Sequence, residues 1–87
     1  MSSEASGGSV RTFFVFTDLP KHIEYRVHPM PLLPEGTVLR IDRIPLRDPA
    51  DRRRVRIVEG EHRVMNRRLV YSTSSGLLQY LELAPAT

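Results

Sequence analysis

The chain has 87 residues, of which 40% are hydrophobic and 26% charged, and it contains no cysteine. Its length allows one domain with a small core, and the lack of cysteine excludes disulfides, thiolate metal sites and a thiol nucleophile. The formal net charge is +3, and twelve of the thirteen basic residues are arginine. Ten arginines lie in residues 40–68 against five acidic residues, a net of +5. This bias suits bidentate contacts with phosphate or carboxylate, although genome composition explains it equally well.

Residues 1–9 are small, polar and rich in glycine and serine, and we expect them to form a disordered tail. They lack the basic and apolar regions of a secretory signal. No apolar run reaches about 18 residues, the length that spans a bilayer. We therefore expect a cytoplasmic protein with no membrane association.

The first two strands are expected at residues 10–17 and 22–28. The first is rich in β-branched and aromatic residues and is apolar on both faces, which indicates a central, covered strand or a strand with an exposed aromatic residue on one side. The second alternates, with Ile23, Tyr25 and Val27 on one face, which is typical of a half-buried strand.

Residues 29–34 contain three prolines, which predicts an extended connection rather than a helix or a central strand. The spacing Pro31-x-x-Pro34 matches the minimal ligand core of SH3 and WW domains, but a rigid loop is the favoured interpretation. If Met30, Leu32 and Leu33 are exposed, they form a docking loop for a partner. If they are packed, which we favour, they cover one end of the barrel.

Three further strands are expected at residues 37–44, 52–59 and 62–72. In the first of these, Arg43 and Ile44 break the alternation and predict a bulge. Gly60 allows a tight hairpin turn between the other two. The irregular pattern of residues 62–72 predicts a register change or a short turn near Asn66.

Within residues 52–59, Val55 and Ile57 share one face and are expected to anchor the strand to the core. Arg54 and Arg56 then share the solvent face. A loop is expected at residues 45–51.

Residues 76–83 fit a helix or a strand equally well, and Pro85 ends either. The pattern as a whole predicts an all-β, mainly antiparallel fold. The expected architecture is a small SH3-like or OB-like partly open barrel of five to six strands, with one short C-terminal helix as the alternative for residues 76–83. The domain should span residues 10–84, and residues 85–87 should form a C-terminal tail.

The arginines suggest a surface for nucleic acid of low sequence specificity, or for an acidic protein partner. The alternative is a solvated strand face balanced by neighbouring acids. The candidate residues share an expected exposed position on the central strands. They are Arg40, Arg43, Arg52, Arg54, Arg56, Arg67 and Arg68.

Four aromatic residues are candidates for stacking on unpaired bases, although a place in the core is favoured for Tyr25 and for most of the phenylalanines. They are Phe13, Tyr25, Tyr71 and Tyr80. The histidines at 22 and 28 lie too far apart on one strand to share a metal, so we expect no metal site. No catalytic motif or cofactor-binding glycine loop is present, so we expect no enzyme and no cofactor.

Two functions follow from the sequence. The first is a non-enzymatic module that binds nucleic acid through the arginines. The second is a protein-interaction or assembly subunit that uses the proline-rich loop, a sheet edge or the arginines, with self-association into a homo-oligomer in the same class.

Overall fold

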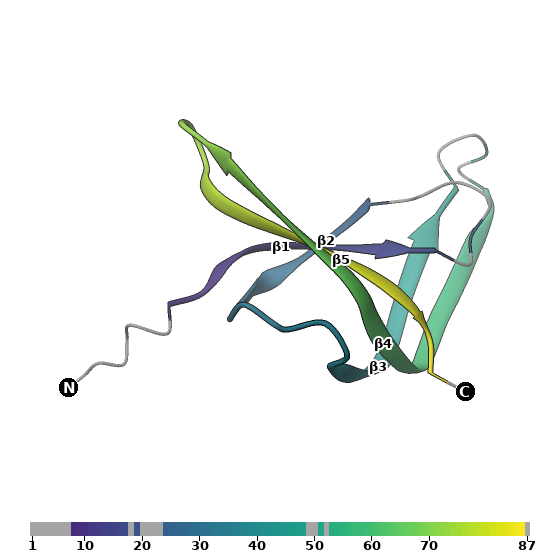
Figure 1. Cartoon of the computed structure of the whole chain (residues 1–87). Coiled ribbons are helices and arrows are strands. Elements are labelled where there is room, and N and C mark those ends of the chain that lie inside the picture. Colours follow the sequence, from purple (N-terminus) through teal and green to yellow (C-terminus); the bar gives the residue numbers. More distant parts are fainter. Residues whose placement is uncertain (1–7, 18, 20–23, 49–50, 52, 87) are drawn as a thin grey trace.

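The computed structural model describes residues 8–17, 19, 24–48, 51 and 53–86, and its five strands form one sheet (Figure 1). Across the sheet, the strands follow the order β2-β1-β5-β4-β3. The strands are β1 (Val10–Phe16), β2 (Glu24–Met30), β3 (Val38–Arg47), β4 (Val55–Ser72) and β5 (Gly76–Pro85).

The sheet curls into a nearly closed barrel that stays open between the edge strands β2 and β3. Strand β1 runs parallel to β5, and the other three neighbouring pairs are antiparallel. This confirms the expected all-β, mainly antiparallel, partly open small barrel with a central first strand. The one parallel pair arises because the β1–β2 pair joins the β3-β4-β5 meander through β1 and β5.

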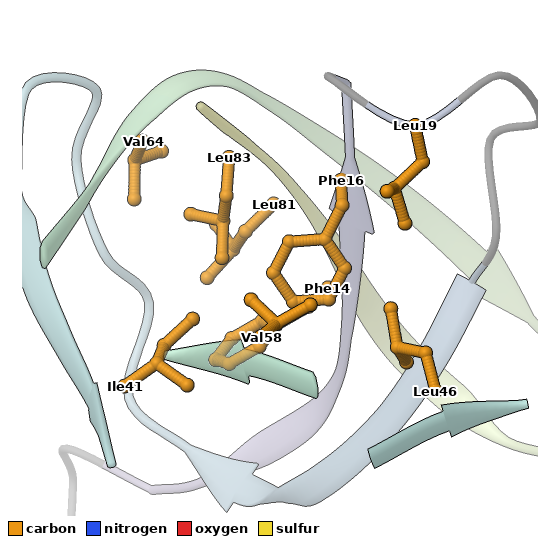
Figure 2. Packing of buried hydrophobic residues seen from close by; sticks show 9 residues of the cluster. All are labelled: Phe14, Phe16, Leu19, Ile41, Leu46, Val58, Val64, Leu81 and Leu83. Carbon is orange, nitrogen blue, oxygen red and sulfur yellow. The ribbon is translucent and has the colours of Figure 1, made fainter. Parts of the chain in front are cut away.

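The barrel interior is filled by alternate side chains of the central strands (Figure 2). Phe14 and Phe16 of β1 lie against Leu81 and Leu83 of β5, and all four are buried. Strands β3 and β4 and the segment after β1 complete the cluster. Their buried members are Leu19, Ile41, Leu46, Val58 and Val64.

The open side of the barrel is lined by partly buried residues of β2 and β3. Tyr25 and Val27 of β2 pack against the core, which confirms their expected inward face. Ile23, expected on the same face, lies outside the described residues. Leu39 and Ile44 of β3 pack against the core from the opposite edge.

Strand β4 is a single 18-residue strand, so the expected hairpin turn at Gly60 is wrong. Gly60 has a φ of 100° but pairs with Ile41 inside the β3–β4 ladder. Positive φ is compatible with a tight turn or with an in-strand irregularity, and here the second occurs. The first half of β4 pairs with β3, and the second half pairs with β5.

Both expected irregularities of the strands are confirmed. The β3–β4 register shifts between Ile41 and Ile44, where β3 has one more residue than β4. The β4–β5 register shifts between Val64 and Asn66, so that Met65 is the extra residue. Each shift is a bulge that turns the following side chains to the opposite face.

The expected faces of the first half of β4 are reversed. Val55 and Ile57 are 49% and 38% exposed, whereas Val58 is buried. Arg56 pairs with the buried Leu46 and therefore lies on the inner side of the strand, at the exposed end of the barrel. Where a strand lies at the rim of a barrel, side chains on both of its faces are exposed. The alternation of apolar and polar residues then does not show which face points inward.

Residues 76–83 form part of β5, so the alternative of a C-terminal helix is wrong. Strand β5 extends to Pro85, and the Ala86 N–H donates to the Glu61 carbonyl at 2.9 Å, so these two residues of the expected tail continue the sheet. Residues 45–47, expected in a loop, extend β3 as an edge strand. The expected N-terminal tail falls mostly on residues 1–7, which lie outside the described part of the chain.

A buried side-chain amide holds the proline-rich connection against the barrel. Gln79 of β5 is fully buried. Its Nε2 donates to the Pro31 carbonyl at 2.8 Å and to Thr12 Oγ1 at 3.0 Å, and lies 3.5 Å from the Met30 carbonyl. Its Oε1 accepts the Leu33 N–H at 3.3 Å.

These contacts compensate for a segment that cannot join a ladder. Proline has no N–H, so the backbone of residues 31–34 needs partners from elsewhere. The Gln79 amide supplies them, and its orientation is fixed because carbonyls surround Nε2 and an N–H faces Oε1. Thr12 is also fully buried, and its hydroxyl donates to the Val10 carbonyl at 2.9 Å. The network is therefore satisfied on both sides.

A test of this network is Gln79→Glu, which keeps the side-chain shape but places a carboxylate oxygen against the Pro31 carbonyl. We expect the free energy of unfolding to fall by about 1 to 3 kcal/mol, because buried polar groups lose their partners. Urea denaturation measures the change. Glu82→Gln, the reverse change at a half-buried position of the same strand, should alter the free energy by less than about 0.5 kcal/mol. Equal losses would contradict the role of the amide.

Candidate interaction surfaces

The continuous β4 separates the arginines that a hairpin would have brought together. A hairpin that turns at Gly60 would place Arg67 and Arg68 level with Arg54, but in the continuous strand Arg67 lies thirteen positions beyond Arg54. Arg54 lies just before β4 and is 3.9 Å from the Asp51 carboxylate, with an exposed side chain. Arg52 lies outside the described residues.

The β3–β4 ribbon carries alternating charges on its outer face. Arg40 pairs in register with Glu61. At the bulge, Asp42 and Arg43 lie opposite Glu59. Opposite charges in cross-strand neighbours offset one another. The arginines of this ribbon therefore belong to a mixed-charge face, as the solvated-face alternative describes.

Arg67 and Arg68 have structural contacts on opposite faces of β4. The Arg67 Nη1 donates to the Leu33 carbonyl at 3.3 Å, so its half-buried side chain holds the proline-rich connection from the β4 side. The Arg68 guanidinium lies 4.9 Å from the centre of the Tyr80 ring. This distance is within the range of a cation–π interaction.

Two of the four aromatic candidates meet on the outer face of the sheet. The rings of Phe13 and Tyr80 stack with their centres 4.9 Å apart and an angle of 13° between their planes. Arg68 pairs with Tyr80, and Arg26 pairs with Phe13, which produces one row of four side chains across β4, β5, β1 and β2. Each half-buried ring already has a neighbour on one of its faces.

The other two aromatic candidates separate. Tyr25 packs against the core, whereas Tyr71 is 74% exposed.

The proposed docking loop also divides. Met30 and Leu33 pack against the core, as the favoured alternative expected, and Leu32 is 42% exposed. A single exposed side chain does not make a hydrophobic patch.

The described residues show neither a cluster of potential metal ligands nor a helix that could span a membrane. In residues 8–17, 19, 24–48, 51 and 53–86, no three potential ligands among His, Asp and Glu lie close enough together to hold a metal ion. The same residues include no helix of the length and apolarity needed to cross a bilayer.

Exposed apolar side chains gather instead on the end of the β4–β5 hairpin, which extends away from the barrel in Figure 1. We call residues 65–78 the arm. Leu69, Tyr71 and Leu77 lie on one face of the arm because the register pairs Tyr71 with Leu77, and Leu69 with Gln79. Val70 lies on the other face. All four apolar side chains are at least 37% exposed, so the arm is apolar on both faces.

The arm also has an unpaired backbone edge. The ladder between β4 and β3 ends at Arg63, and Val64 is the last residue of β4 that bonds to the chain on that side, through Gly36 and Thr37. From Met65 to Ser72, the described chain places no strand on this edge of β4. An exposed edge of this kind is a template for strand addition.

Other free edges of the sheet are interrupted. The outer edge of β2 includes Pro29, and that of β3 includes Pro45 and the bulge. The free part of β4 before Glu61 includes Gly60 with positive φ and several charges. Such features discourage edge-to-edge pairing. The edge of the arm contains no proline, glycine or acidic residue.

The sequence shows the apolar runs of the arm, Leu69-Val70-Tyr71 and Leu77-Leu78, but it does not show that they are exposed. A run of apolar residues at a hairpin end is normally assigned to the core, and only the strand order shows that, among the described residues, no further strand pairs with this end of the hairpin. Comparison with known protein families, with curated proteins and with solved structures found no match, so these surfaces are the basis for a function.

Proposed function

We propose that the chain is a small non-enzymatic protein-interaction module that binds an extended strand of its partner along the edge of the arm. The observation that carries this proposal is the coincidence of an unpaired eight-residue edge with exposed apolar side chains on both faces. The edge supplies backbone hydrogen bonds, and the apolar faces supply buried area when a strand is added.

The alternative use of the chain as a polyelectrolyte binder through the β3–β4 ribbon has less support. The ribbon places Glu59 and Glu61 beside its arginines. The arm contains only two charged side chains, Arg67 and Arg68, and both have intramolecular contacts. Apolar contact and backbone pairing therefore contribute more than charge to binding at the arm.

A triple variant tests the proposal: Leu69→Ser, Tyr71→Ser and Leu77→Ser. We expect each change to alter the free energy of unfolding by less than about 0.5 kcal/mol because the side chains are exposed. Affinity capture from cells that express the chain should nevertheless lose the nuclease-resistant protein partner that the unchanged chain retains.

The matched control for this experiment is a double variant, Val38→Ser and Val55→Ser, which removes apolar side chains of similar exposure on β3 and at the start of β4. It should retain the partner. Loss of the partner in both variants, or in neither, would contradict docking at the arm.

A second candidate function is binding of single-stranded nucleic acid at the outer face of the sheet. It is favoured by the row of Arg26, Phe13, Tyr80 and Arg68, beside which Arg11 stands in the next row with Leu78. Neither of these two rows contains an acidic residue, whereas the row on the other side, through Val15, contains Glu24 and Glu82. Three arginines around two aromatic rings combine charge with an apolar surface, which is the chemistry of single-strand binding.

This candidate predicts a specific salt dependence. Three phosphate contacts correspond to a slope of about −2 in a plot of log affinity against log salt concentration for a single strand. Fluorescence titration of an oligonucleotide measures the slope. Arg26→Glu with Arg68→Glu should abolish binding, whereas Arg40→Glu with Arg43→Glu on the ribbon should leave most of it. No binding at low salt would eliminate this candidate.

A further inference from the structure

We infer that the strand added to the arm is the arm of a second copy of this chain, so that two copies form a symmetric antiparallel dimer centred on Leu69. This inference rests on the proposed function and names its partner. It follows from which backbone groups face the free edge, from the registers that the charges allow, and from the side chains that those registers bring together.

The direction of the backbone groups follows from the β5 ladder. The Leu83 carbonyl accepts the Thr17 N–H at 3.0 Å and therefore faces β1. Because backbone groups alternate sides along a strand, Leu81, Gln79 and Leu77 also face β1.

The partners of these three β5 residues on β4 then face away from β5. They are Arg67, Leu69 and Tyr71. Their N–H and C=O groups consequently lie along the free edge of the arm, at every second residue. This spacing is the one that an antiparallel strand pairs with.

One register uses all of these groups. If Leu69 of one copy lies opposite Leu69 of the other, Arg67 lies opposite Tyr71 at both ends. This arrangement forms about six intermolecular hydrogen bonds. A shift of the centre to Val70 leaves the outward groups of Arg67 without a partner from the same set.

Repulsion between like charges disfavours a shift of the dimer register in the other direction, toward Arg68. A register centred on Arg68 places two guanidinium groups directly opposite each other, which is destabilising. In the register centred on Leu69, Arg68 lies opposite Val70 instead. The arm contains no acidic residue that would favour either shifted register.

The side chains of the paired arms are complementary. Directly opposite residues in antiparallel strands share a face, so Leu69 contacts its own copy and Arg67 meets the exposed Tyr71. An arginine beside an aromatic ring gains a cation–π contact. The apolar residues Leu69, Tyr71 and Leu77 of both copies then form one continuous face across four strands.

The test introduces a positive charge at Leu69 in one variant and a negative charge in another, and compares each variant alone with their mixture. The purified full chain should show a concentration-dependent dimer in sedimentation equilibrium. Leu69→Lys and Leu69→Glu should each weaken dimerisation by about 10-fold or more, because each variant places like charges opposite each other. An equimolar mixture of the two variants should restore the dimer as a heterodimer, which also shows that both variants are folded.

Val38→Lys and Val38→Glu are the matched controls, since Val38 and Leu69 are both 45% exposed and Val38 lies on β3. These controls should dimerise like the unchanged chain, alone and mixed. A chain that stays monomeric at all concentrations overturns the inference, as does a dimer that responds equally to changes at both positions, or a mixture that fails to restore it.

The two proposals fail separately. If the purified chain is monomeric but the triple arm variant still loses a captured partner, the arm binds a different protein and only the second-copy inference is overturned. If the chain is monomeric and the triple variant retains every partner, docking at the arm is itself wrong.

Discussion

The side-chain amide of Gln79 is the interaction on which the shape of this barrel depends. Strands β2 and β3 are the two edges of the sheet, and the chain between them contains prolines that cannot pair with a strand. Gln79 lies on the interior face of β5 and bonds to Pro31 and Leu33, which fixes this connection across the inside of the barrel. Arg67 holds the same connection from β4. The contacts of Gln79 and Arg67 with this connection thus hold both edge strands close to the central strands, although β2 and β3 do not pair with each other.

This arrangement determines how β4 is divided. One edge of β4 pairs with β3 and, at Val64, forms backbone hydrogen bonds with Gly36 and Thr37 of the connection. The bulge at Met65 then changes the register with β5, and the remainder of β4 continues beyond the reach of β3. One long strand therefore serves two neighbours in turn, and its distal half keeps one edge unpaired. The exposed edge of the arm is a direct consequence of a short β3 paired with a long β4.

The sequence was sufficient for local features and insufficient for choices that depend on distant segments. Alternation and turn residues identified the strands, and broken alternation located both bulges. Gly60 was misassigned because positive φ fits a hairpin turn and an in-strand irregularity equally well, and only pairing with Ile41 distinguishes them. The expected arginine surface required a hairpin at Gly60. Because β4 continues through Gly60, the arginines before and after it lie far apart along the strand. The role of Gln79 could not be predicted, because the partners of a single polar residue in an apolar strand do not show in the local sequence pattern. Its partners lie 46 or more residues away in the chain.

The free edge of the arm also decides what kind of assembly strand addition would produce. Strand β5 is paired with β1 from Leu78 onward, so each arm offers the β4 edge alone. In the proposed dimer, that edge is used once by each copy, and the pairing is related by a two-fold axis. An interface of this kind closes on itself, whereas a head-to-tail contact between different edges continues into a filament. The prolines of β2 and β3 and the bulge of β3 oppose such a second contact. The same features that leave one edge open and interrupt the others therefore favour two copies over an open-ended array.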